Sequence, residues 1–179
     1  KKVKKKYIID FKKKNYPIHI PIFDKLTDDK SDKIRKEREK KDILILEGWC
    51  CACPPLDKKY LEKNLNKLEK LEDKKMIWRN YFNKKLNNEY KKLFQLFDRT
   101  IFLKAPSFSF VLNWRLNQEK MNKSNSKKYK KMNRKEIVYF ILHYEKITKW
   151  MIKKLPNIAD LVININKNQK IVKRKLNQF

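Results

Sequence analysis

Glycine is nearly absent from this sequence: Gly48 is the only one in 179 residues. The glycine-rich loops that hold nucleotide phosphates follow the patterns G-x-x-x-x-G-K-[ST] or G-x-G-x-x-G, and each pattern needs at least two glycines. Neither can be written within these residues, so the chain cannot form such a loop by itself. The chain also begins with lysine rather than methionine, and we therefore expect a fragment or a processed form.

Long apolar runs and ordered cysteine patterns are missing as well. No stretch of about 18 apolar residues and no signal-peptide core is present, so we expect no membrane partner. Cys50, Cys51 and Cys53 fit no zinc-binding spacing, and no second cysteine pair exists to complete such a site. Three is also an odd number for a disulfide framework. The pattern favours reduced thiols in a cytoplasmic protein.

Acidic residues are few beside the basic ones: 48 Lys and Arg against 20 Asp and Glu give a net charge of +28. Phosphate binding needs such charge, so a nucleic-acid partner is one interpretation. The excess is almost all lysine, accompanied by many Asn and Ile, which is typical of an AT-rich genome, and we favour that explanation. The runs KKVKKK at 1–6 and KKYKK at 127–131 are the best candidates for a functional basic patch. The aromatic residues follow core periodicities, which argues against base stacking and a nucleic-acid partner.

The residues that are present suffice for one folded domain over 1–179, since 41% are hydrophobic and 12% aromatic. Short apolar runs bounded by charge or proline predict buried strands, and apolar residues at helical spacing predict helices. We expect strands at 42–48, 99–106 and 159–166, and an edge strand at 170–177. We expect helices at 1–14, 57–96 with a break near 72–75, 107–121 and 133–155, the last two capped by Ser107 and Asn133. An extended segment at 16–25 and a polar, partly helical connection at 27–41 complete the chain. Strands that alternate with helices indicate an α/β fold with a parallel sheet.

Glu47 draws attention because it follows the apolar run ILIL at 43–46 and precedes the only glycine. In parallel sheets, ligands bind at the carboxyl ends of the strands. A carboxylate in that position can face a ligand or a metal ion, and Gly48 lets the backbone turn there. A structural interpretation, in which Glu47 caps a helix or forms an ion pair, stays equally open on the pattern alone.

Four segments in order resemble the D-glycerate 3-kinase family: IPIFDKLTDDK (20–30), ILEGWC (45–50), FLKAPSFSFVLNWRLNQE (102–119) and HYEKITKWMIKKLPNIADLVININKNQKI (143–171). The resemblance covers nearly the whole chain and implies a three-layer, P-loop kinase-like fold related to uridine kinase and phosphoribulokinase. It implies ATP-dependent phosphorylation of D-glycerate to a phosphoglycerate with Mg²⁺. The family begins with a strand, a P-loop and a helix, and such a unit takes about 30 residues or more. We therefore expect this chain to be the carboxyl-terminal portion of one kinase domain, with its P-loop unit missing and little activity alone.

The resemblance assigns roles to the residues of the first segment. Asp24 would orient the acceptor hydroxyl and take its proton, and Lys25 would pair with the glycerate carboxylate. Asp28 and Lys30 resemble substrate-binding residues of the family, with lysine where the family has arginine, which removes the bidentate fork. A surface Asp24–Lys25 pair and a solvated loop are the alternatives.

Roles for the later segments follow in the same way. Glu47 would hold Mg²⁺ or serve as the base, and Trp49 would line the substrate pocket or belong to the core. Arg115 would stabilise charge on the transferred phosphoryl group and contact ATP, as in a kinase lid, with Gln118 binding substrate. The alternative for Arg115 is a structural ion pair with Glu119, one helical turn away.

His143 and Lys146, in the segment HYEK at 143–146, also differ in what we expect of them. His143 is expected to be structural, because phosphoryl transfer to a hydroxyl does not need it, and Lys146 stands where the family has arginine. Two other functions stay open for the whole chain. One is a non-catalytic kinase-like remnant that binds RNA or an acidic partner. The other is a kinase for a different small hydroxy acid or sugar.

Overall fold

The computed structural model describes residues 2–24, 29–121 and 132–177, with residues 2–4, 24, 29 and 30 described by their backbone only. The chain divides into two compact units, one of residues 1–49 with 125–130 and one of residues 50–124 with 131–179. No helix among the described residues is long and apolar enough to cross a membrane.

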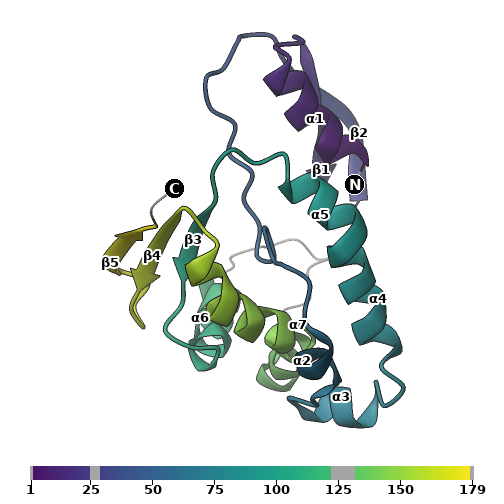
Figure 1. The fold of residues 1–179 in the computed structure, drawn as a ribbon, viewed down its shortest axis with the longest axis vertical. Helices are drawn as coiled ribbons and strands as arrows, with labels where there is room; N and C mark the ends of the chain where they lie inside the picture. Colours follow the sequence, from purple (N-terminus) through teal and green to yellow (C-terminus); the bar gives the residue numbers. More distant parts are fainter. Residues whose placement is uncertain (1, 25–28, 122–131, 178–179) are drawn as a thin grey trace. The chain divides into compact units, whose positions relative to one another are not determined.

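The first unit contains one helix and a β-hairpin (Figure 1). Helix α1 (Lys2–Lys12) precedes strand β1 (Ile18–Asp24), which pairs antiparallel with strand β2 (Asp29–Glu37). Helix α1 and strand β1 confirm the helix expected at 1–14 and the extended segment expected at 16–25. The expectation of a partly helical connection at 27–41 is wrong for β2, whose residues DKSDKIRKE form a strand through backbone pairing with β1.

The predicted strand at 42–48 is also wrong. Residues 43–48 adopt no regular secondary structure, and Ile43 and Ile45 are 77% and 81% exposed. A strand needs a neighbour for its backbone N–H and C=O groups, and none of the described strands pairs with this segment. The apolar sequence alone therefore does not make it a strand in this structure.

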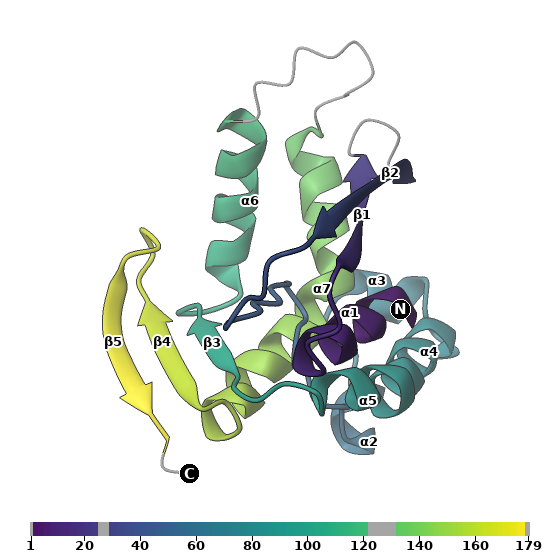
Figure 2. The same ribbon diagram turned by 90° about the horizontal axis from the view of Figure 1, so that it is seen from above.

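The second unit is built on a three-stranded mixed sheet in the order β3–β4–β5 (Figure 2). Strands β3 (Ile101–Lys104) and β4 (Leu161–Ile165) run parallel, and β5 (Ile171–Leu176) returns antiparallel to β4. The predicted α/β class and these three strands are confirmed. All of β5 is exposed, as expected of an edge strand.

Helices supply the rest of the second unit. They are α2 (Lys58–Glu62), α3 (Lys67–Leu71), α4 (Ile77–Lys85), the π-helical turn η1 (Leu86–Tyr90), α5 (Lys91–Phe94), α6 (Ser109–Met121), α7 (Arg134–Lys154) and the 3₁₀ turn η2 (Leu155–Asn157). The gap between α3 and α4 is the break that the sequence predicts. Helix α6 begins two residues after Ser107, whose hydroxyl contacts that of Ser109. One core joins α7 to the sheet and to the segment 53–86; it includes Cys53, Leu61, Phe82, Phe102, Trp150, Leu155 and Val162.

Helix α7 begins as the sequence predicts, at an Asn133 cap. The Asn133 side chain accepts a hydrogen bond from the Glu136 N–H at 3.0 Å, and the Glu136 carboxylate accepts one from the Asn133 N–H at 2.7 Å. This reciprocal capping box satisfies two donors that the helix end would otherwise leave unpaired.

Replacing Asn133 by alanine should lower the free energy of unfolding by about 1 kcal/mol, since the substitution removes the cap. Asn117→Ala is the matched control, because Asn117 is exposed in the interior of α6 and alanine is the better helix former. Urea denaturation followed by circular dichroism measures both. Equal effects of the two substitutions would show that the cap does not stabilise the helix.

Candidate active site

The residues of the FDKLTDDK motif lie at one end of the β1–β2 hairpin. Strand β1 ends at Asp24 and β2 begins at Asp29, and the backbone register places Asp24 opposite Asp29 and Phe23 opposite Lys30. Asp24 and Lys30 are thus brought to the same end of one hairpin. Lys25 and Asp28 lie outside the described residues. The pairing of this motif across a hairpin was not expected from the sequence.

Glu47 and Trp49 follow the irregular segment 43–48, and both are exposed. The expected position of Glu47 at the end of a strand is therefore not found. Its carboxylate makes no hydrogen bond or ion pair within the described part of the chain. No group of three His, Cys, Asp or Glu among the described residues could hold a metal ion. Mg²⁺ is commonly held by one or two carboxylates together with water and substrate phosphates, and a single accessible carboxylate such as Glu47 suits that mode.

Arg115 lies on α6 and forms an ion pair in the second unit. Its Nη1 lies 2.6 Å from Glu119 Oε2, and its Nη2 donates to Met132 Sδ at 3.8 Å. The buried Glu119 also accepts a hydrogen bond from the Met132 N–H at 2.9 Å, so the pair ties α6 to the residues just before α7. The structural alternative for Arg115 is thus present, while its proposed contact with a phosphoryl group stays a prediction. Gln118, also on α6, is exposed.

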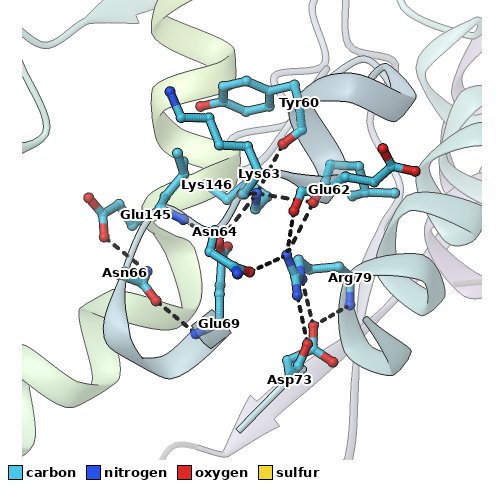
Figure 3. A network of polar contacts seen from close by, with 12 residues as sticks. Tyr60, Glu62, Lys63, Asn64, Asn66, Glu69, Asp73, Arg79, Glu145 and Lys146 are labelled. Carbon is cyan, nitrogen blue, oxygen red and sulfur yellow. Dashed lines mark hydrogen bonds and ion pairs between the residues drawn. The ribbon is translucent and has the colours of Figure 1, made fainter. Parts of the chain in front are cut away.

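Lys146, from the HYEK segment, is fully buried and bonds to backbone carbonyls (Figure 3). Its Nζ lies 3.0 Å from the Tyr60 oxygen, 3.2 Å from the Leu61 oxygen and 2.5 Å from the Lys63 oxygen. It also lies 3.3 Å from Glu69 Oε2. Burial lowers the pKa of Lys146, and Glu69 partly opposes this shift. Lys146 therefore joins α7 to the end of α2.

Arg79 is the second buried cation of the same cluster. Its Nε donates to Asp73 Oδ2 at 2.9 Å, and its Nη1 donates to Asn64 Oδ1 at 2.9 Å and to the carbonyls of Leu61 and Glu62 at 3.3 Å. Asp73 in turn accepts from the N–H groups of Trp78 and Arg79 at the start of α4. Burial would raise the pKa of Asp73, but these hydrogen bonds and the charge of Arg79 lower it.

The cluster is closed by Asn66 and Glu145. Asn66 caps α3 by accepting from the Glu69 N–H, and its Nδ2 donates to Glu145 Oε2 at 2.9 Å and to the Leu142 carbonyl at 3.0 Å. We call the set Asn66, Glu69, Asp73, Arg79, Glu145 and Lys146 the buried polar network. Sequence reasoning missed it. The only signal was the lysine of HYEK at the family's arginine position, which the network now shows to be structural. His143, expected to be structural, is exposed and its Nδ1 lies 3.1 Å from the Tyr139 carbonyl oxygen.

The three cysteines are free thiols. Burial raises the pKa of Cys50 to about 11, and it raises the pKa of Cys53 as well. Cys53 packs in the core, where its Sγ lies 3.4 Å from the Pro54 carbonyl oxygen. Thiols with raised pKa values are poor nucleophiles, so these two cysteines have the properties of core residues.

The fold defines a class of known proteins. No family model matches the chain. The solved structure of D-glycerate 3-kinase from Cryptococcus neoformans superimposes with a TM-score of 0.74 at 20% identity, over 98% of this chain and 66% of that one. The YGR205w protein superimposes with a TM-score of 0.62 at 19% identity, over 97% of this chain and 62% of that one. The chain therefore has an α/β kinase-like fold, and the expected resemblance to D-glycerate 3-kinase is confirmed in that fold.

A sequence relative points the same way. The Schizosaccharomyces pombe protein described as "Uncharacterized kinase mug58" is 31% identical over 103 residues, which are 56% of this chain and 35% of that protein. The chain spans about a third of this curated relative and just under two thirds of the two solved chains.

Lys146→Met should lower the free energy of unfolding by about 3–5 kcal/mol, because it removes the cation beside the buried Glu69 and a donor from each of three carbonyls. Lys58→Met is the matched control: Lys58 Nζ lies 4.0 Å from Glu62 Oε1, and the two side chains are 90% and 49% exposed. That change should cost about 1 kcal/mol or less. Urea denaturation measures both, and similar losses from the two would contradict the assigned role of the network.

The lowered pKa of Asp73 predicts a specific loss of stability in acid. The folded state binds the proton of Asp73 more weakly than the unfolded chain does. Its contribution is therefore complete above the ordinary value of 3.8 and is lost as the pH falls through the folded pKa. Asp73→Asn should lower stability at pH 7 and flatten the fall of unfolding free energy below pH about 4. Asp57→Asn, in the exposed cap of α2, is the control. If the free energy of unfolding of Asp73→Asn falls in acid as steeply as that of Asp57→Asn, the prediction is refuted.

Proposed function

We propose that this chain belongs to a glycerate kinase-like phosphotransferase that transfers the γ-phosphoryl group of ATP to D-glycerate, with Mg²⁺. The observation that carries the proposal is the fold shared with D-glycerate 3-kinase over 98% of the chain. The four motif segments support it, because they contain an acid and cations of the kind that binding an anionic hydroxy acid would need.

The chemistry needs positioning and charge neutralisation more than covalent steps. Asp24, at the hairpin end, would accept the proton of the acceptor hydroxyl as that oxygen attacks the phosphorus. Lys25, Lys30 and Asp28 would bind the acceptor, the two cations facing its carboxylate. Trp49 would line the pocket, and Gln118 would contact the acceptor.

Charge on the phosphates is the other requirement. Glu47 would hold Mg²⁺, which would supply positive charge to offset that of the phosphates. Arg115 would contact ATP and stabilise the phosphoryl group during transfer. These roles rest on the motif positions, and the described geometry of Glu47 and Arg115 is compatible with them.

The 179 residues contain no phosphate-binding loop of the P-loop type, since they hold one glycine. We therefore propose that the chain alone turns over little or no ATP, and that turnover requires a protein in which these residues occur together with such a loop. Because the chain spans just under two thirds of the kinase structure it matches, a longer protein fits this proposal.

A coupled assay of ADP release tests the proposal. The purified chain should show no D-glycerate-dependent ADP release above background. In a protein that joins these residues to a G-x-x-x-x-G-K-[ST] segment, Asp24→Asn should lower kcat by about 10²- to 10⁴-fold, because the proton acceptor is lost.

Glu39→Gln is the matched control, because Glu39 is an exposed acid of the same unit outside the motifs. It should leave kcat unchanged. Turnover by the chain alone, or full activity of Asp24→Asn, would overturn the corresponding part of the proposal. Activity with another small hydroxy acid or a sugar but none with D-glycerate would keep the kinase and change the acceptor.

A further inference from the structure

Helix α4 presents two aromatic rings to solvent in the second unit. Trp78 and Tyr81 are 48% and 52% exposed, their ring centroids are 5.9 Å apart and their planes are within 24° of parallel. Phe82 and Leu86, on the other side of the same helix, are buried in the core. The expectation that the aromatic residues follow core positions is thus wrong for this pair.

The sequence on either side of these rings is rich in lysine. The segment 74–88, KKMIWRNYFNKKLNN, contains no Asp or Glu. Lys74, Lys75 and Lys84 are exposed, and Lys85 Nζ lies 5.5 Å from the centroid of the Tyr81 ring. The nearest preceding acid in the sequence, Asp73, is buried against Arg79. Glu89, which follows the segment, forms an ion pair with Lys85.

The spacing explains how rings and charges share one surface. Residues three and four apart lie on the same side of a helix. Trp78, Tyr81 and Lys85 therefore fall in one row, and Lys84 lies three residues beyond Tyr81. We call Trp78, Tyr81, Lys84 and Lys85, together with the preceding Lys74 and Lys75, the α4 platform.

We propose that the α4 platform binds single-stranded nucleic acid. Unpaired bases stack on exposed aromatic side chains, and each stacked base contributes substantially without regard to sequence. Lysines beside the rings would contact the phosphates that connect those bases. Lysine is abundant over the whole chain, so charge alone distinguishes no surface. What distinguishes this face is its pair of exposed, near-parallel rings. They lie in a segment that contains lysines and no acid.

The exposed rings need a partner with flat, accessible groups that can stack on them. This requirement distinguishes an unpaired strand from a duplex and from an acidic peptide. The bases of a duplex are stacked on one another and are not available to the rings. The carboxylates of an acidic peptide would contact the lysines but do not stack on rings. Every nucleotide of an unpaired strand carries both a base for the rings and a phosphate for the lysines. This proposal is independent of the proposed kinase activity.

Fluorescence anisotropy with a short labelled oligouridine, at about 0.15 M salt, tests the platform in the 179-residue chain. Trp78→Ala/Tyr81→Ala removes both rings and no charge. We expect it to weaken binding by about ten-fold or more while the dependence of affinity on salt stays the same. Phe23→Ala is the control, because it removes another exposed ring, also without a change of charge, and should change affinity less than two-fold.

A second pair of variants keeps the test valid if loss of both rings unfolds the chain, which circular dichroism would reveal. Lys84→Glu should weaken binding more than Lys173→Glu, an equal change of charge on the exposed strand β5. Three results would each overturn the proposal: no binding by the unaltered chain, equal binding by the ring variant, or equal affinity for duplex RNA of the same length.

Discussion

The buried polar network is the interaction on which the second unit depends. Helices α2 and α3 have five residues each, too short to be stable alone. The last turn of α2 leaves carbonyls without partners inside the helix, those of Tyr60, Leu61, Glu62 and Lys63. Lys146 and Arg79 supply the missing donors from α7 and α4 (Figure 3). Because each cation needs a buried anion, Glu69 and Asp73 are fixed in turn.

The two cations are suited to different partners. The ammonium of Lys146 is a compact charge with three donors, which matches carbonyl oxygens that converge from Tyr60, Leu61 and Lys63. The planar guanidinium of Arg79 has five donors in a fixed fork, which matches a carboxylate on one side and carbonyls on the other. Burying such charges costs desolvation, which offsets much of their attraction. Their hydrogen bonds hold residues 60–66 beside α7.

The sequence predicted what depends on local patterns and missed what depends on partners. Helix α7 and its Asn133 cap follow from periodicity and a capping residue. Strands β3 and β4 follow from short apolar runs. The predictions for two segments were wrong in opposite ways: 29–37 is a strand that was not predicted, and the strand predicted at 42–48 is not found. The reason is the same, because a strand requires a neighbour. The polar residues 29–37 have β1 beside them, and the apolar run at 43–46 has no paired strand among those described. The contacts of Lys146 were missed because its carbonyl partners lie 83 to 86 residues away in the sequence. Those of Arg79 lie 6 to 18 residues away, but they cross the turns between short helices, which no periodicity predicts.

For the candidate site, the same dependence on partners separates Glu47 from Arg115. Glu47 is exposed and makes no hydrogen bond or ion pair with the residues that the structure describes, so binding a cation costs it no contact with them. Arg115 already holds the buried Glu119, and breaking that pair would remove a cation from a buried carboxylate. A guanidinium, however, carries five N–H donors, and the Glu119 contact uses one at Nη1 while the Met132 sulfur is a weak acceptor. Arg115 can therefore keep Glu119 and still offer donors to a phosphoryl group. On this argument the ion pair and the proposed catalytic role are not alternatives, because the pair orients the side chain that the role requires.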